Sequence, residues 1–170
     1  LHPEEDAGAS AAERIESVRA ELHAQGANAT IITMIDELAW VFNVRGNDVL
    51  FNPVAVAFGY IGEKEAVIFV RPEKVPDEVR AYLVKNGVTI KDYTDLDSFV
   101  ASLGADVRLL VDTKRITYHI YSLIPAHCRK IEGVSALTHL KSIKNATELA
   151  NLRKVMARDA AALTRFFKWL

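Results

Sequence analysis

The sequence predicts a three-layer α/β domain in which helices flank a mixed β-sheet. Short apolar segments rich in Val and Ile alternate along the chain with segments whose apolar residues recur at helical intervals. Two adjacent apolar segments, Val54–Ile61 and Glu65–Arg71, are separated only by Gly62-Glu63-Lys64, a short Gly-containing link that is typical of a β-hairpin. A hairpin among alternating strands and helices makes the sheet mixed rather than all parallel.

The first part of the chain predicts one helix and one strand after an irregular lead-in at Leu1–Ala9. Ser10 and Glu13 have the spacing of a capping box, which predicts that a helix begins here. Apolar residues then recur at helical intervals until Gly26, a residue type that commonly ends helices. The short β-branched segment Asn28–Thr33 follows, and we expect it to be a buried strand.

The segments around and after the hairpin continue this alternation. Glycine and proline at Gly87, Gly104 and Pro125 favour breaks between elements. The expected elements are a helix at Ile35–Phe42, the two hairpin strands, a helix at Asp77–Asn86, a strand at Val88–Lys91, a helix at Leu96–Leu103, a strand at Val107–Val111 and a helix at Ile116–Ile124.

From Lys130 we expect the chain to leave the domain, through a helical turn at Ser135–Leu140 and a connector at Lys141–Lys144. Asn145 and Glu148 then have capping-box spacing and predict a long final helix. Its apolar residues keep helical spacing almost to the end of the chain, where four of the last five residues are large and apolar. Because such a stripe usually marks a missing partner surface, we infer that this helix belongs to a further domain.

These features divide the chain into three parts. They are a lead-in at residues 1–9, an α/β domain at residues 10–140, and a connector with the first helix of another domain at residues 141–170. The chain begins at Leu1 rather than Met, so we expect the natural N-terminus, and any targeting peptide, to lie upstream.

The composition limits the classes of function. The 21 basic and 22 acidic residues give a formal net charge of −1, which argues against a dedicated nucleic-acid or acidic-membrane surface. No apolar run reaches the length of about 18 residues that a membrane span needs. Cys128 is the single cysteine, which excludes an internal disulfide and favours the reducing cytosol.

The stretch Asp36–Pro53 combines two kinds of sequence. It begins in a helix that contains Trp40, and from Asn43 onward it carries three Asn, one Asp, one Arg and one Gly. These residue types suit special backbone geometry and polar contacts. Two interpretations stay open, namely a turn whose side chains bond their own backbone and a loop that presents groups to a ligand.

The residues show no recognisable catalytic constellation. Ser, Cys and His lack nucleophile-elbow spacing, and no Gly-rich phosphate loop occurs. The candidate metal ligands have separations that match no short pair that one helix or loop would hold rigidly. These candidates are His119, His127, Cys128 and His139.

Two stretches resemble a known family. Ile32–Pro53 contains Asp-Glu-Leu-Ala-Trp, Phe-Asn-Val-Arg-Gly-Asn-Asp and Asn-Pro in that order. It resembles the signature of the second domain of the long, three-domain aminopeptidase P, or Xaa-Pro aminopeptidase, of the creatinase/prolidase superfamily, with Val44 in place of the usual Leu. Lys141–Arg153, followed by Asp159-Ala160 and Phe167–Leu170, resembles the family's junction into its catalytic pita-bread domain.

This resemblance implies a creatinase/prolidase N-terminal fold of RNase H-like topology. It implies that the chain is the non-catalytic middle domain of a metal-dependent Xaa-Pro aminopeptidase, which removes the N-terminal residue of peptides with proline second. The domain would support the active-site cleft and the assembly. In this family two Asp, one His and two Glu of the C-terminal domain hold two metal ions, so we expect no catalytic or metal-binding residue here and an inactive isolated chain.

The resemblance also implies cofactors, partners and a location. The whole enzyme would use two divalent metal ions, with manganese as the expected metal. The expected partners are the catalytic domain of the same polypeptide and proline-containing peptides, with a homodimer as a candidate assembly. Neither nucleic acid nor a membrane is an expected partner, and the expected location is cytoplasmic.

Asn43, Arg45 and Asp48 are the candidate substrate-binding residues. Arg45 is a planar cation with several donors, so it could pair with a peptide carboxylate or backbone oxygen, or it could tie the loop to an interface. Asn43 and Asp48 are expected to hold the loop in shape. Two other functions stay open: a stand-alone α/β binding or interaction module, and an RNase H-like nuclease, for which the strand ends offer chiefly Asp112.

Overall fold

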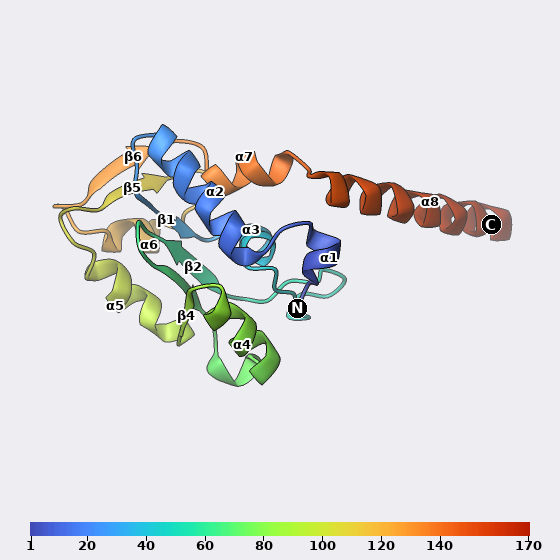
Figure 1. The fold of residues 1–170 in the computed structure, drawn as a ribbon, viewed down its shortest axis with the longest axis horizontal. Coiled ribbons are helices and arrows are strands. Elements are labelled where there is room, and N and C mark those ends of the chain that lie inside the picture. Colours follow the sequence, from blue (N-terminus) through green and yellow to red (C-terminus); the bar gives the residue numbers. More distant parts are fainter.

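The computed structural model describes residues 1–170 and contains one six-stranded mixed sheet (Figure 1). The strands are β1 (Ala29–Ile32), β2 (Phe58–Ile61), β3 (Ala66–Phe69), β4 (Val88–Lys91), β5 (Arg108–Val111) and β6 (Arg129–Glu132). They lie in the order β4-β3-β2-β1-β5-β6. The pairs β1/β2 and β2/β3 are antiparallel, and the pairs β3/β4, β1/β5 and β5/β6 are parallel. The predicted mixed sheet is confirmed.

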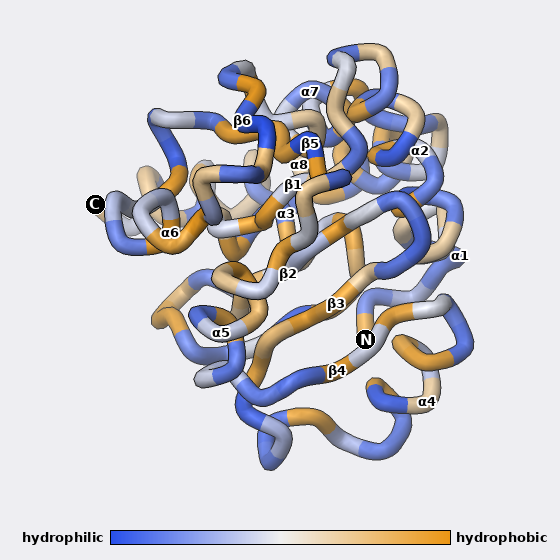
Figure 2. Tube along the Cα trace, turned by 90° about the vertical axis from the view of Figure 1, so that its left-hand side faces the viewer, coloured by the Kyte–Doolittle hydropathy of each residue, from blue (hydrophilic) through white to orange (hydrophobic).

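Helices cover both faces of this sheet and bury two separate hydrophobic clusters. One face carries α2, α3, α4 and α7 around Leu22, Leu38 and Leu83, and the other carries α5 and α6 around Val100 and Ile120. Figure 2 shows hydrophobic residues along the central strands between these layers. The helices are α1 (Glu4–Ala7), α2 (Ala11–Ala24), α3 (Ile35–Val41), α4 (Asp77–Lys85), α5 (Leu96–Ala101), α6 (Tyr118–Leu123), α7 (Ala136–Ser142) and α8 (Ala146–Trp169), with short 3-10 turns at Pro72–Lys74 and Tyr93–Asp95.

The two predicted capping boxes begin the helices α2 and α8. In the first, the Ser10 hydroxyl accepts a hydrogen bond from the Glu13 amide, and the Glu13 carboxylate accepts one from the Ser10 amide. Asn145 and Glu148 make the equivalent pair of bonds at the start of α8. Because each pair satisfies two amides that lack a partner within the helix, both helices begin where the sequence predicts.

Helix α8 extends away from the rest of the domain (Figure 1). It is 24 residues long, and none of its residues is buried. None of the helices is both long enough and apolar enough to cross a membrane.

Three sequence-based predictions are wrong in detail. The first hairpin strand begins at Phe58 rather than Val54, because residues 54–56 bond the preceding polar loop instead of a neighbouring strand. The chain does not leave the domain at Lys130, which lies in β6 and pairs with Leu109 of β5. The lead-in is not wholly irregular, since it contains the single turn α1 and buries Ala7.

Candidate functional site

The polar loop at residues 43–53 follows α3 and folds back on itself. Val49 and Asn52 form an isolated antiparallel bridge, so the loop ends in a tight turn. Phe51 lies in this turn with φ of 62° and is 97% exposed. A left-handed conformation is costly for an aromatic residue, and burial of the side chain does not compensate for it here. The loop therefore presents an apolar tip to its surroundings.

Asp48 stabilises the base of this loop. One carboxylate oxygen accepts a hydrogen bond from the Val56 amide at 2.8 Å, and the other accepts one from the Lys74 ammonium at 2.8 Å. The Lys74 side chain, and then the Val56 amide, lower the pKa of Asp48 below its ordinary value. Both oxygens of the Asp48 carboxylate are therefore bound within the chain.

Arg45 lies beside α3 without an acidic partner in the chain. One of its terminal nitrogens donates to the carbonyl oxygens of Ala39 at 2.6 Å and of Val44 at 2.9 Å. Burial, and then the nearby charge of Arg14, lower the pKa of Arg45. A guanidinium that is partly desolvated and repelled by another cation is stabilised by a nearby anion.

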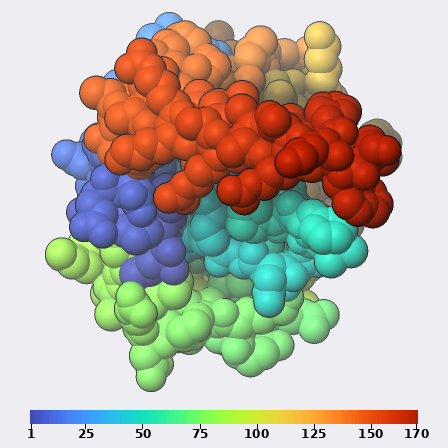
Figure 3. Space-filling model, turned by 90° about the vertical axis from the view of Figure 1, so that its right-hand side faces the viewer, coloured from blue at the N-terminus to red at the C-terminus, as the bar shows by residue number.

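A groove runs between Arg45 and the first turns of α8, with a cavity volume of about 610 Å³. In Figure 3 the helix crosses above the N-terminal residues and the segment around residue 50 on one face of the molecule. The groove lining includes four cations, namely Arg45, Lys144, Lys154 and Arg158, but only two acids, Asp6 and Glu148. Since Glu148 is already paired with Arg14 at 3.0 Å, the groove favours an anionic ligand such as a carboxylate.

Asn43 does not face this groove. Its side chain is fully buried, with the amide oxygen bound to Arg14 at 2.6 Å and the amide nitrogen bound to the carbonyl of Ala9 and the hydroxyl of Tyr82. The structure therefore brings Asn43, Arg45 and Asp48 onto one loop but turns them in different directions. Of the three, Arg45 has unbound donors at the groove.

The structure adds Arg14, Trp40 and Glu148 to these residues. The Arg14 guanidinium contacts Glu148 and lies 4.7 Å from the centre of the Trp40 ring, while the indole nitrogen of Trp40 donates to Glu148 at 3.1 Å. One signal in the sequence points to Arg14. It shares a helical face with the buried residues Ala11 and Val18, a position where an exposed charge is not expected.

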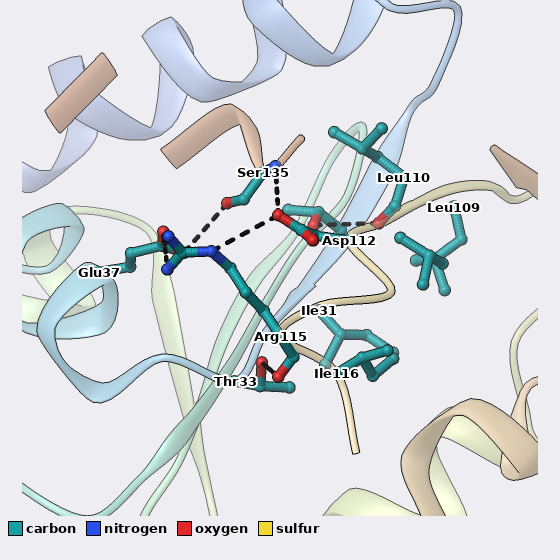
Figure 4. Close-up of a pocket in the computed structure, with 11 residues that line it drawn as sticks. Ile31, Thr33, Glu37, Leu109, Leu110, Asp112, Arg115, Ile116 and Ser135 are labelled. Atoms are coloured by element: carbon teal, nitrogen blue, oxygen red, sulfur yellow. Dashed lines mark hydrogen bonds and ion pairs between the residues drawn. The ribbon is translucent and has the colours of Figure 1, made fainter. Parts of the chain in front are cut away.

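A second polar cluster lies at the carboxyl ends of β1 and β5 (Figure 4). Glu37 is 3% exposed and accepts hydrogen bonds from Arg115 at 3.3 Å, from the Ser135 hydroxyl at 3.0 Å and from the Thr138 hydroxyl. Asp112 lies 3.5 Å from Arg115 and accepts a bond from the Ser135 amide. The cavity is about 20 Å³, room for about one water molecule. This cluster ties α3, β5 and α7 together and leaves no space for the two metal ions of a nuclease site.

The four candidate metal ligands lie apart or take other partners. His119 forms a hydrogen bond with Asp97, and His139 lies 3.4 Å from the Glu21 carboxylate. His127 and the buried thiol of Cys128 both contact the carbonyl oxygen of Leu103. No group of three or more His, Cys, Asp or Glu side chains in the chain is arranged to hold a metal ion. The donor set of this chain therefore does not fit a dinuclear metal centre.

Comparison with known proteins places this domain in a family. Residues 1–148 match the sequence family described as the Creatinase/Prolidase N-terminal domain. The chain is 36% identical to a probable Xaa-Pro aminopeptidase P of Sordaria macrospora, over 96% of this chain and 28% of that protein. It is 32% identical to aminopeptidase P1 of Arabidopsis thaliana, over 100% of this chain and 30% of that protein. The chain thus spans less than a third of the length of these relatives.

Solved structures agree with this assignment. X-prolyl aminopeptidase from Caenorhabditis elegans, described as a cytosolic enzyme with a di-nuclear active site, matches 100% of this chain and 28% of its own with a TM-score of 0.92 and 27% identity. A Xaa-Pro dipeptidase from Bacillus anthracis shares the fold, with a TM-score of 0.72 over 95% of this chain and 44% of its own, at 18% identity. The chain belongs to the creatinase/prolidase N-terminal domain family.

Proposed function

We propose that this chain is the non-catalytic middle domain of a metal-dependent Xaa-Pro aminopeptidase. The observation that supports the proposal is the match to the C. elegans enzyme, which covers 100% of this chain, with α8 included, and 28% of that enzyme. In this proposal residues 10–140 form the supporting domain, and residues 141–170 lead into the catalytic domain as its first helix. The reaction is removal of an N-terminal residue that precedes proline.

The exposed apolar side of α8 supports this division. Leu152, Val155, Leu163 and Phe167 recur along the helix and are between 48% and 67% exposed. In water most helical stability comes from packing of an apolar face, so a 24-residue helix with no buried residue gains stability from a covering surface. We propose that the catalytic domain of the same polypeptide supplies that surface.

The groove at Arg45 gives the domain its role toward substrate. We propose that Arg45 binds a carboxylate of the peptide, while Asn43 and Asp48 fix the shape of the loop that carries it. The catalytic domain would hold the two divalent metal ions, manganese in this proposal, which supply the activated water for peptide cleavage. A cytoplasmic location and a homodimeric assembly complete the proposal.

Kinetics of the full-length polypeptide test the role of Arg45. Arg45→Gln removes the cation, so we expect KM for a peptide with proline second to rise about tenfold, the equivalent of one lost charge-assisted hydrogen bond, with kcat unchanged. Arg45→Lys keeps the charge and should recover part of the affinity. Arg80→Gln, an exposed arginine on α4, is the matched control. Unchanged KM for Arg45→Gln would exclude this residue from substrate binding.

The polypeptide beyond Leu170 tests the proposal as a whole. That part of the polypeptide should contain the two Asp, one His and two Glu of the metal site. The full-length protein should cleave Xaa-Pro peptides when divalent metal is added. A coding sequence that stops just after Leu170 would contradict the proposal and favour the stand-alone binding module.

A further inference from the structure

Helix α8 is attached to the domain through polar contacts. The Asn145 side chain donates to the carbonyl of Ala7 at 2.9 Å, and the Asn151 side chain donates to the carbonyl of Asp6 at 3.1 Å. Further hydrogen bonds join Glu148 to Arg14 and Trp40. Since no α8 residue is buried, these directional bonds set the orientation of the helix.

A single guanidinium joins three parts of the fold at this point. The Arg14 side chain is 5% exposed. One terminal nitrogen donates to the carbonyl of Trp40 at 2.5 Å and to the side chain of Asn43 at 2.6 Å. The other donates to the carbonyl of Ala7 at 2.9 Å and to Glu148 at 3.0 Å. We call Arg14, Trp40, Asn43 and Glu148 the Arg14 junction.

Asn43 is the residue through which the junction reaches the loop. Its φ of 52° is left-handed, which sets the direction in which the chain leaves α3. Besides Arg14, its side chain bonds Tyr82 and its carbonyl accepts a bond from the His2 amide at 2.7 Å. The conformation at the start of the loop thus depends on the same guanidinium that holds Glu148.

We propose that Arg14 is a positioning residue that couples the orientation of α8 to the orientation of the loop at residues 43–53. Its planar donors reach Asn43 and Glu148 in one fixed geometry, which a lysine ammonium cannot reproduce. A change at Glu148 on the helix is therefore transmitted to the loop. The coupling rests on these contacts within the chain and holds whether or not the chain serves a peptidase.

Distances between spin labels test this coupling in the 170-residue chain with Cys128 replaced by Ser. One label at Ser102→Cys serves as the reference, and the second is placed either on α8 at Ala157→Cys or on the loop at Leu50→Cys; all three positions are exposed. A third pair, Ser102→Cys with Asp77→Cys, reports whether the domain itself stays folded. Electron–electron resonance then gives the distance distribution of each pair.

We expect Glu148→Gln to shift or broaden the distance distribution of the loop pair as well as that of the α8 pair. Asn151→Ala is the matched control, because it also weakens the attachment of α8 but does not touch the Arg14 junction. It should change the α8 pair alone. Arg14→Lys should change the distance distributions of both the α8 pair and the loop pair. It should leave the distribution of the third pair, Ser102→Cys with Asp77→Cys, unchanged.

Two results would overturn the proposal. One is a loop pair that keeps its wild-type distribution in Glu148→Gln while the α8 pair changes. The other is an equal effect of Glu148→Gln and Asn151→Ala on the loop. Arg14→Lys could also alter the distance between the labels at Ser102→Cys and Asp77→Cys. In that case the comparison of Glu148→Gln with Asn151→Ala decides whether the coupling exists, since neither variant removes a group from the domain core.

Discussion

Replacement of Arg14 by Met removes the donor of four hydrogen bonds from a buried position. It leaves the carbonyls of Ala7 and Trp40 and the side chains of Asn43 and Glu148 without this partner. Loss of one member of a buried ion pair costs about 3–5 kcal/mol. Glu148 keeps 18% of its side chain exposed and retains its bond from Trp40. We therefore expect the free energy of unfolding to fall by about 3 kcal/mol, at the lower end of that range.

Thermal and urea unfolding measure this loss. For a chain of this size about 3 kcal/mol lowers Tm by roughly 6–12 °C. Arg19→Met is the control on the same helix. It loses an ion pair with Glu16, which is 69% exposed, and a hydrogen bond to the Gly62 carbonyl at 2.9 Å, so it should cost about 1 kcal/mol. The double variant Arg14→Met/Glu148→Gln should recover part of the loss, because no charged carboxylate then lacks its partner, while the oxygen of the new glutamine side chain can still accept the bond from Trp40 or that from the Asn145 amide. An equal, small cost for Arg14→Met and Arg19→Met would refute the importance of the buried pair.

Three further predictions concern the loop, and all can be measured on the isolated chain. In Gly46→Ala the new methyl group would lie 2.8 Å from Cβ and 2.9 Å from Cα of Ala55. We therefore expect urea unfolding to show a free energy of unfolding that is lower by about 1–3 kcal/mol. A variant as stable as the wild type would show that the two segments can separate freely. Phe51→Gly removes left-handed strain of about 1–2 kcal/mol, which exceeds the extra freedom that Gly brings to the unfolded chain. Its stability should stay equal or rise, and a clear loss would mean that Phe51 packs against the domain. The pKa of Asp48 is lower in the folded chain than its ordinary value of 3.8. The ionised carboxylate therefore stabilises the fold at pH values above the unfolded pKa, and this stabilisation is lost as the pH falls through the folded pKa, which lies below 3.8. The Val56 amide resonance should report that transition by NMR, and Asp48→Asn should abolish it; a midpoint above 3.8 would be inconsistent with the bond to Lys74.

Local signals in the sequence predict local structure well. The capping boxes at Ser10 and Asn145 lie within one turn of the helices they begin, so residue types and spacing suffice to locate them. The sequence does not predict the edge strand β6, because three of the four residues in Arg129–Glu132 are charged. This segment gains its strand conformation from pairing with β5. The composition of Val54–Ala57 predicts a strand. In the structure, however, the amides of Val54 and Val56 and the carbonyl of Val54 form hydrogen bonds with the preceding loop.

The candidate site was predictable in part. The polar loop and Arg45 stand out in the sequence because of their composition, and the resemblance identifies the same stretch. The partners of Arg14 lie between 7 and 134 residues away, so no local pattern could indicate them. The buried position of Asn43 likewise depends on Tyr82, which comes from another helix. Nonlocal contacts of this kind decide which residues of the loop face the groove.

The direct measurement is turnover of a peptide with proline in second place by the purified 170-residue chain, with added manganese, beside the full-length polypeptide. Because the proposal puts the metal site in the catalytic domain of the whole polypeptide, we predict turnover by the full-length polypeptide and none by the chain alone. Turnover that follows the 170-residue chain through purification would contradict the proposed role as a non-catalytic domain.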